Sequence, residues 1–468
     1  AAANSAGLKR TARRHIDVAQ RALRSRTTDR EHLRAELVIA AVWFEGMTKP
    51  ETSWFDRLLQ SERDRHGEGG PQGLRNLSNP SVRQFFLTQP FDTYRLLAAE
   101  QDRNGQALAA MRSLERYRLQ HRAASGSWLD SELWYRDIPA DTVLISYGAF
   151  DDQLVIYAAS VNGVERATVA LSPRDVEKRA VSFSQALRTR DVRAARVTGG
   201  VLYRALIGPV ANVIAKASSI VVVPDPSMPQ ISFSALLQPS SRYLAQDHAV
   251  AVVSDIASYM ESLRTERTTA RAVLAVGNPV LSNDLKSLGS LTAAETEAQE
   301  IAAMYPSHAV LVRGDATKQR VMSALAYCDV AHFGAHAVVA LNDVAPPHLL
   351  LSESGEDDGR LSASEIAERR LDGLRMVVLA ACSTAVTTPR GPETRSLVDA
   401  FLTAGAGSVV GALWEIDDAI TREMSLEIHR ALRSGATPAA ALRAAQLRMI
   451  ESRPPSDWAA LQLYGSGL

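Results

Sequence analysis

Cysteine is nearly absent from this chain of 468 residues, which contains only Cys328 and Cys382. This small number of thiols excludes a secreted scaffold held by disulfides and favours a reducing compartment. We therefore expect a cytoplasmic protein. No stretch reaches the roughly 18 consecutive apolar residues that a membrane-spanning helix needs. The first residues, Ala1–Asn4, lack both a methionine and the basic-then-apolar order of a signal peptide, and the missing methionine suggests a trimmed N terminus.

Excess charge of either sign is also absent, because 52 basic residues balance 52 acidic ones. This balance excludes bulk attraction to nucleic acid or to an anionic membrane surface. Three nucleotide and hydrolase signatures are missing as well. No Gly-Lys pair provides a phosphate-binding loop, no Gly-x-Gly-x-x-Gly follows a strand, and no Gly-x-Ser-x-Gly is present.

The length indicates more than one domain, and the first 125 residues have the texture of an α-helical domain. Apolar residues recur at three- and four-residue spacing before residue 45 and again over 91–122, around a polar loop at 61–79. No clear 34-residue repeat emerges. Two interpretations remain open, a helical packing domain and a degenerate, tetratricopeptide-like helical array that docks a partner.

A second domain is predicted over residues 133–265, where an α+β pattern begins. The β-branched and aromatic runs 142–147 and 154–159 flank Asp151-Asp152 and predict a hairpin, and 167–171 predicts a third strand. Helices are expected over 174–188 and 200–217, with further strands over 220–223 and 249–253.

Over the third predicted domain, residues 270–468, apolar strands alternate with amphipathic helices. This alternation predicts a mostly parallel sheet covered by helices on both faces. Two helix starts have capping-box spacing, Thr292 with Glu295 and Ser362 with Glu365. The predicted strands cover residues 272–276, 309–312, 330–333, 376–381 and 408–413.

Three reactive residues follow these strands, namely His336, Cys382 and Asp417. Because the carboxyl ends of parallel strands meet at one edge of a sheet, we expect them to lie close together. A thiolate beside a histidine can attack a carbonyl, and backbone N–H groups can bind the oxyanion that forms. The alternative is that Cys382 is a small buried apolar residue and His336 is structural. We expect His332 and Cys328 to be buried and unreactive.

The second half resembles the CHAT domain, a bacterial caspase-like family grouped with caspases, separases and gingipains and often found behind tetratricopeptide repeats. The resemblance covers roughly residues 135–468. It rests on segments in family order: Val221–Pro226, Ile231–Leu236, Tyr243-Leu244, His248–Val250, His332–His336, Asp358–Leu361, Glu365-Ile366, Val377–Thr384, Ala400–Val410, Leu413-Trp414 with Asp417-Asp418, and Asp457–Ala460.

The resemblance implies a caspase-like cysteine endopeptidase in which Cys382 is the nucleophile and His336 the base. It also implies that the Ala337 and Cys382 N–H groups bind the oxyanion, with no metal or organic cofactor. The spacing of 46 residues agrees with the caspase rule of a histidine about 50 residues before the cysteine. The chain departs from the family at Ala337, where glycine is usual, at Ser383 and Ala385, and in a thinned loop at 390–393.

The candidates for the substrate pocket are Trp414, Glu415, Asp417 and Asp418. A carboxylate there can select a basic side chain, whereas Asp417 can also be simply the cap of the next helix. The family suggests bacterial signalling or defence, a protein substrate such as a gasdermin-like or neighbouring-gene product, and an activating partner bound by the helical region. We expect no direct contact with nucleic acid or membrane. The alternative is a scaffold that binds proteins through a latent or inactive protease fold.

Overall fold

The computed structural model describes residues 93–119, 133–150, 153–264, 270–338, 347–355, 357–380, 385 and 396–468. The chain divides into two compact units, 1–123 and 124–468. The helices predicted before residue 93, the candidate nucleophile Cys382 and most of the loop after it lie outside the described residues. The proposed boundary near residue 265 stays a prediction.

The described part of the first unit is a helical hairpin. Helix α6 (Thr93–Arg103) and helix α7 (Ala107–Leu119) pack against one another, as the apolar spacing over 91–122 predicts. Gly105 breaks this stretch into two helices, because its φ of +75° lies in the left-handed region that glycine adopts without strain. Ala110, Met111 and Leu114 bury the shared face.

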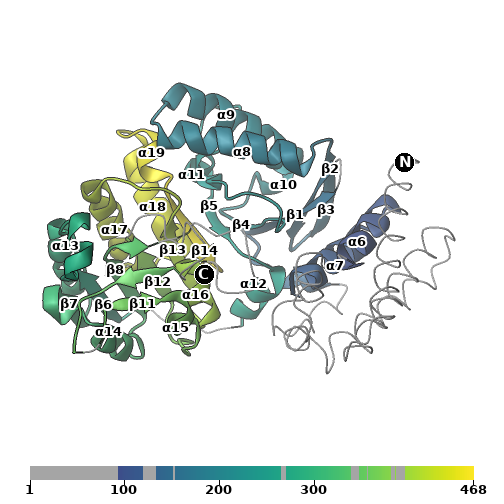
Figure 1. Cartoon of the computed structure of the whole chain (residues 1–468). Coiled ribbons are helices and arrows are strands. Elements are labelled where there is room, and N and C mark those ends of the chain that lie inside the picture. Colours follow the sequence, from purple (N-terminus) through teal and green to yellow (C-terminus); the bar gives the residue numbers. More distant parts are fainter. Residues whose placement is uncertain are drawn as a thin grey trace, which may run out of the picture. The chain divides into compact units, whose positions relative to one another are not determined.

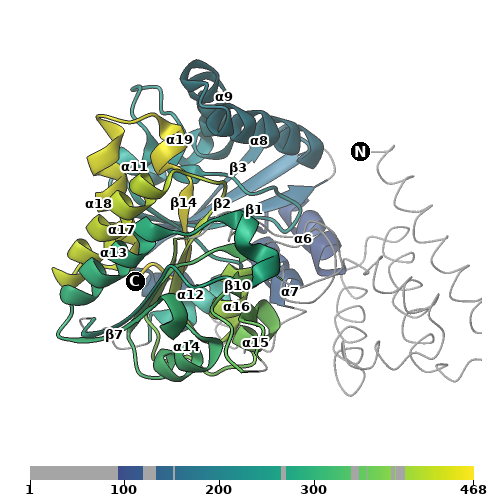
Figure 2. The same ribbon diagram turned by 60° about the vertical axis from the view of Figure 1, so that its left-hand side comes forward.

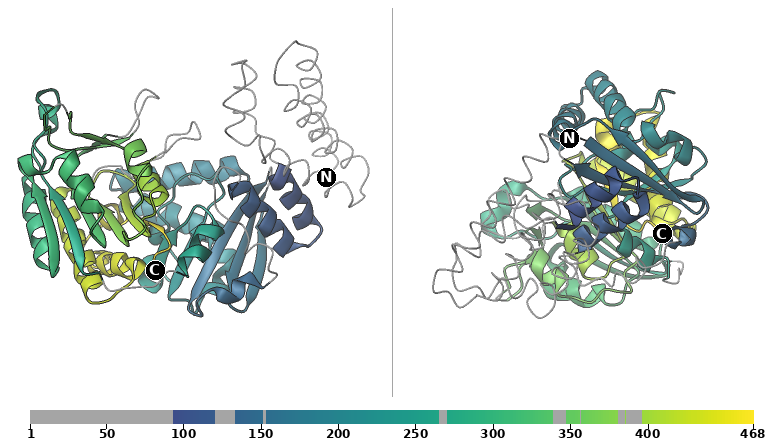
Figure 3. Two further views of the ribbon diagram at one scale, coloured as in Figure 1. Left: turned by 90° about the horizontal axis from the view of Figure 1, so that it is seen from below. Right: turned by 90° about the vertical axis from the view of Figure 1, so that its right-hand side faces the viewer.

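The second unit is built on one large sheet, seen along its length in Figure 3, where the blue and green strands stand at its opposite ends. β1, β4 and β5 run parallel, as do β13, β12, β8, β6 and β7. In spatial order the strands are β3 (Gly163–Val169), β2 (Gln153–Ser160), β1 (Thr142–Phe150), β4 (Ser219–Val223), β5 (Ala249–Val252), β14 (Leu461–Gly465), β13 (Ser408–Ala412), β12 (Met376–Leu379), β8 (Val330–Gly334), β6 (Ala272–Gly277) and β7 (Ser307–Val312).

Helices cover both faces of the sheet, as Figure 2 shows for α13, α17 and α18 on one side and α14, α15 and α16 on the other. The mostly parallel, helix-covered sheet predicted from the sequence is therefore confirmed. The helices of the second unit are α8 (Pro173–Arg188), α9 (Val192–Leu206), α10 (Ala211–Ile214), α11 (Leu244–Asp247), α12 (Ile256–Ser262), α13 (Thr292–Ala303), α14 (Lys318–Leu325), α15 (Ala363–Ala367), α16 (Leu397–Thr403), α17 (Asp418–Arg433), α18 (Pro438–Ile450) and α19 (Pro455–Trp458).

Strand β14 joins the two halves of the sheet and has no counterpart among the predicted strands. It pairs antiparallel with β13 and parallel with β5. This strand therefore connects the group β3-β2-β1-β4-β5 to the group β13-β12-β8-β6-β7. The hairpin predicted around residues 151–152 is confirmed as β1 and β2. The single helix predicted over 200–217 is wrong, because α9 ends at Leu206 and a 3₁₀ turn separates it from α10.

One of the two predicted capping boxes is also wrong. Helix α13 is capped at Leu291 rather than at Thr292, and the Leu291 N–H donates to Asn278 Oδ1 at 2.9 Å. Asn278, which is 13 residues earlier in the chain, therefore accepts the hydrogen bond that the side chain of a capping box would otherwise accept. The second box is confirmed, with Ser362 capping α15 and Glu365 reaching back to the Ser362 N–H at 2.9 Å.

Two glycines at the ends of neighbouring strands let α13 approach the sheet closely. A Cβ on Gly277 would lie 2.3 Å from the Ala294 oxygen, and one on Gly334 would lie 2.8 Å from the Ala294 Cβ. Both approaches are shorter than van der Waals contact allows, so only glycine permits this packing. The first turn of α13 thereby sits against the end of β8.

A small second sheet lies beyond β8, made of β9 (Ala337–Val338), β10 (His348–Leu350) and β11 (Arg360–Ser362) in the order β11-β10-β9. Gly359 enters β11 with a φ of +70°, and a Cβ there would lie 2.4 Å from the Leu351 oxygen. Among the described residues, no single helix is both long and apolar enough to cross a membrane, whereas the bent pair of α9 with 208–214 reaches that length and composition together.

Candidate active site

Three adjacent parallel strands deliver the candidate residues to one edge of the sheet (Figure 1). His336 follows β8 by two residues, and Asp417 and Asp418 begin the helix that comes after β13. β12, the strand that precedes Cys382, lies between β8 and β13. The described residues therefore bring His336 and Asp418 to the same edge.

His336 is half-buried, and a backbone carbonyl holds its ring. Its Nε2 lies 3.2 Å from the Gly289 oxygen. Because a carbonyl oxygen only accepts, Nε2 carries the hydrogen, and in the neutral imidazole Nδ1 is then the free base. Gly289 ends a 3₁₀ helix with a φ of +80°, so the carbonyl that orients the ring sits in a glycine turn.

The backbone N–H of Ala337 lies outside the ladder of the small sheet. The Leu350 N–H donates to the His336 oxygen at 2.8 Å, so Ala337 and Leu349 are a non-hydrogen-bonded pair. In such a pair each N–H points away from the partner strand, and β9 is the edge strand. Ala337 is an extended residue with no positive φ, so its backbone does not require the glycine usual in the family.

The described chain on both sides of Cys382 is firmly anchored. Leu379 pairs with Phe333 in the parallel ladder. Ala385 is buried, its N–H donates to the Ala412 oxygen at 3.1 Å, and its carbonyl accepts from the Gln230 amide. The methyl group at 385 is thus part of the core.

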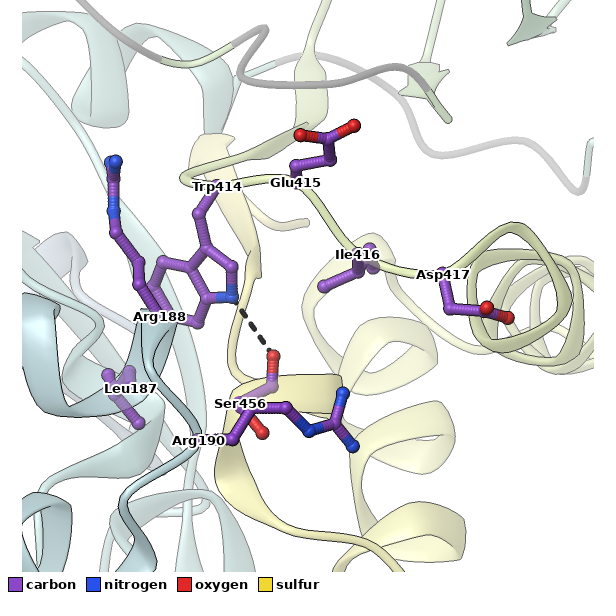
Figure 4. Close-up of a pocket in the computed structure, with 8 residues that line it drawn as sticks. All are labelled: Leu187, Arg188, Arg190, Trp414, Glu415, Ile416, Asp417 and Ser456. Carbon is purple, nitrogen blue, oxygen red and sulfur yellow. Dashed lines mark hydrogen bonds between the residues drawn. The ribbon is translucent and has the colours of Figure 1, made fainter.

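An open pocket of about 370 Å³ lies beside the segment that links β13 to α17, with one wall from the end of α8 (Figure 4). Leu187 and Arg188 stand on one side of the Trp414 indole, and Ile416 and Asp417 on the other. The indole Nε1 donates to the Ser456 oxygen at 2.9 Å, which fixes this wall. Three of the four predicted pocket residues line it, namely Trp414, Glu415 and Asp417.

Both arginines of the pocket are bound to other groups. Arg188 Nη2 donates to the Leu413 oxygen at 3.1 Å. Arg190 pairs with the buried Asp457 through two contacts, of 2.9 and 3.1 Å. Within the part of the chain that the structure describes, Glu415 has no ion pair, so the pocket retains an unneutralised carboxylate.

The two aspartates at the start of α17 have different surroundings. Asp417 caps the helix, since its Oδ1 accepts from the Ala419 N–H at 2.9 Å, and it also lines the pocket. The pKa of Asp418 is raised by burial and then by the charge of Asp417, while His336 opposes the rise. Asp418 therefore interacts with the candidate base rather than lining the pocket beside Trp414.

Cys328 is buried, and its Sγ donates to the Leu325 oxygen at 3.7 Å. Burial raises the pKa of this thiol to about 12, so it carries almost no thiolate near neutral pH. The predicted burial of this thiol is confirmed. His332 is fully buried, as predicted.

Residues 196–466 match the CHAT domain, more than half of the chain, and the protein belongs to this family. Over 325 residues, 59% of the chain, it is 25% identical to Tetratricopeptide repeat protein 28 of Homo sapiens; over 239 residues, 42% of the chain, it is 28% identical to the Mus musculus protein of that name. It spans only 13% and 10% of these relatives.

The fold is also similar to that of a separase. The separase–securin complex of Saccharomyces cerevisiae superposes with a TM-score of 0.55 over 92% of this chain and 40% of the other chain, at 10% identity. A likeness at this identity concerns the fold, which is the caspase-like arrangement of a mostly parallel sheet between helical layers. The resemblance inferred from the motifs is thereby confirmed.

Sequence reasoning missed the residues that complete this edge from elsewhere in the chain. Gly289, Arg188, Arg190 and Ser456 have no local signature of a site. Asp457 belongs to a quoted family segment, and the structure supplies its role, which is to hold Arg190 beside the pocket.

Proposed function

We propose that the protein is a cysteine endopeptidase in which Cys382 attacks the scissile carbonyl and His336 is the base. The observation that carries the proposal is the shared register of β8 and β12. Phe333 pairs with Leu379, and His336 and Cys382 each follow that pair by three residues. Strands that pair lie about 5 Å apart, so their continuations start side by side.

The chemistry follows from the groups at this edge. His336 Nδ1 accepts the thiol proton, and the thiolate forms a bond to the substrate carbonyl carbon. The Ala337 N–H, free of the ladder, and the Cys382 N–H donate to the oxyanion. The imidazolium then protonates the leaving amine, which leaves a thioester. Water, deprotonated by His336, hydrolyses the thioester and restores the thiol.

The pocket charge favours a basic residue before the cut. Glu415 and Asp417 are exposed carboxylates on one wall, and Asp418 follows them in sequence. Of the two arginines opposite, Arg190 is neutralised by Asp457, whereas Arg188 donates to a carbonyl and keeps its charge, so the carboxylates of the pocket outnumber its uncompensated cation. A substrate arginine can pair with such carboxylates through two parallel hydrogen bonds. A substrate with an acidic residue there would be repelled.

The test compares the wild type with Cys382→Ala and His336→Ala on a fluorogenic peptide library and on neighbouring-gene proteins. Each protein is assayed with and without the other neighbouring products as activators. Cys328→Ala and His308→Ala are matched controls, since both residues lie outside the site. We expect cleavage after arginine or lysine to vanish in Cys382→Ala, to fall about 10²–10⁴-fold in His336→Ala, and to persist in the controls.

A protein partner belongs to the same proposal. The family context in bacterial signalling or defence, and a fold neighbour solved as a separase–securin complex, support an activator or inhibitor that binds this chain. The second candidate function is a binding scaffold with an inactive protease fold. It would be supported if no condition gave cleavage while partner binding persisted.

A further inference from the structure

The solvent side of helix α8 carries a row of exposed side chains that ends at the pocket. Helices α8 and α9 pack against one another and form a hairpin at the surface of the second unit (Figures 1 and 2). One side of α8 is buried in the core, through Val176, Ala180, Phe183 and Leu187. On the opposite side five exposed residues recur at three- and four-residue spacing, and we call them the α8 stripe: Arg174, Lys178, Val181, Gln185 and Arg188.

The neighbouring helix has the same pattern. Val197 on α9 is 62% exposed and stands between Arg193 and Arg204, at spacings of four and seven residues. Val181 in the α8 stripe is 55% exposed. Seven large apolar side chains are exposed among the described residues, and three of them belong to this hairpin, namely Val181, Val192 and Val197. Exposed apolar side chains that cations flank are typical of a binding surface rather than of a solvated helix.

The hairpin also holds an excess of positive charge in a chain that is neutral as a whole. Residues 173–206 include eight basic side chains and three acidic ones. Two of the acidic groups, Asp175 and Asp191, accept hydrogen bonds at the starts of the two helices, at 2.7 and 2.9 Å. Within the described residues, none of the three cations of the α8 stripe has an ion pair. The stripe therefore presents uncompensated positive charge to solvent.

An acidic protein segment fits this surface better than a nucleic acid or a membrane does. The aromatic rings of the two helices, Phe183 and Tyr203, are buried, so no exposed ring can stack on a base. The apolar side of each helix is turned into the core, so neither helix can insert that side into a lipid interface. Val181 and Val197 can contact an apolar side chain while the flanking cations bind carboxylates. We propose that the α8 stripe and the row on α9 dock an acidic, amphipathic segment of a partner protein.

The stripe ends in the wall of the pocket, so the partner would also act on the substrate. Arg188 lines the pocket, and its Nη2 donates to the Leu413 oxygen at 3.1 Å. Within the described chain it pairs with no carboxylate, whereas Arg190 pairs with Asp457. A partner carboxylate at Arg188 would neutralise this cation and strengthen the preference for a substrate arginine. This link rests on the proposed function, whereas the docking does not.

Docking is tested on the full chain with a synthetic helical peptide that carries leucine and glutamate at three- and four-residue spacing. A peptide of the same composition in scrambled order is the reference, and fluorescence anisotropy measures both dissociation constants. We expect the ordered peptide to bind about 10-fold more tightly, because only its order places leucine against Val181 between the cations. Val181→Asp and Lys178→Glu should each weaken its binding by about 10-fold.

The matched control is Arg179→Glu, which makes the same charge change one residue past Lys178. Arg179 is exposed and lies about 100° around the helix from Lys178, away from the stripe. This variant should therefore weaken binding by less than about threefold. All three substituted positions are exposed, so the fold should be kept, which circular dichroism checks.

Four results would each overturn the docking proposal. They are equal weakening in Arg179→Glu and Lys178→Glu, an unchanged affinity in Val181→Asp, equal binding of the scrambled peptide, and no binding at about 1 mM peptide. Tighter binding of polyuridylate or of phosphatidylserine vesicles than of the ordered peptide would overturn it as well, since the surface would then serve a nucleic acid or a membrane.

The link to the pocket is tested by the kcat/KM ratio of arginine over glutamine substrates. At a concentration of ordered peptide that saturates the wild type, this ratio should rise about two- to fivefold, and the rise should vanish in Val181→Asp. An unchanged ratio with the peptide bound would overturn the link through Arg188. An absence of all cleavage with the peptide bound would refute the peptidase and leave the docking supported, so the two failures are distinguishable.

Discussion

Replacement of His429 by glutamine should lower the free energy of unfolding at neutral pH. In acid, the variant and the wild type should have almost the same free energy of unfolding. At pH 7.5 the variant loses the contacts of 2.8 Å to Tyr305 and 3.4 Å to His332. Each buried hydrogen bond contributes about 0.5–1.5 kcal/mol, so the loss is about 2 kcal/mol.

The acid effect acts in the opposite direction. Because burial lowers the pKa of His429, the unfolded chain binds a proton below the ordinary value of 6.5 that the folded chain does not. The wild type therefore keeps its full stability above this value and loses it as the pH falls. At pH 5 the loss is about 2 kcal/mol, and the glutamine variant is spared it.

Urea unfolding at pH 7.5, 6.5, 5.5 and 5.0, followed by near-ultraviolet circular dichroism, measures the difference. We expect the free-energy gap between wild type and variant to shrink from about 2 kcal/mol to near zero. His308→Gln is the control, because that side chain is exposed. A gap that stays constant with pH would refute a neutral, buried His429.

Three further predictions concern the candidate site. Ala337→Pro removes an N–H outside the ladder and should lower kcat by about 10²–10³-fold with the fold retained. Val338→Pro, at the next residue, should instead destabilise the small sheet. Cleavage assays measure the first effect and circular dichroism measures the second. Glu415→Gln removes a carboxylate that lines the pocket and should reduce the kcat/KM ratio of arginine over glutamine substrates, and an unchanged ratio would remove this residue from specificity. Gly334→Ala should cost about 1–3 kcal/mol of unfolding free energy, since its Cβ would lie 2.8 Å from that of Ala294, and a neutral effect would contradict the close approach of α13.

The parallel, helix-covered sheet could be predicted because it depends on local patterns of apolar and polar residues. Apolar runs such as 376–379 and 408–412, alternating with amphipathic helices, specify parallel strands buried on both faces. The position of His336 just beyond its strand followed from the same pattern. The sequence allowed two interpretations of Asp417, as a helix cap and as a pocket residue. The structure places this side chain both at the cap of α17 and in the wall of the pocket.

The remainder depends on contacts between distant segments. Strand β14 is only five residues long and gains its place by pairing with β13 and β5. The cap of α13 comes from Asn278 on another segment. His332 and His429 are 97 residues apart, so no local spacing indicates that their rings meet.

The most direct test of the account is the rate of alkylation of Cys382 by iodoacetamide as a function of pH, read by peptide mass spectrometry. Cys328 provides a buried internal reference. If His336 stabilises the thiolate, Cys382 should react well below the ordinary thiol pKa of about 8.5, and His336→Ala should return the profile to that value. Identical profiles in the wild type and His336→Ala would contradict the cysteine–histidine pair.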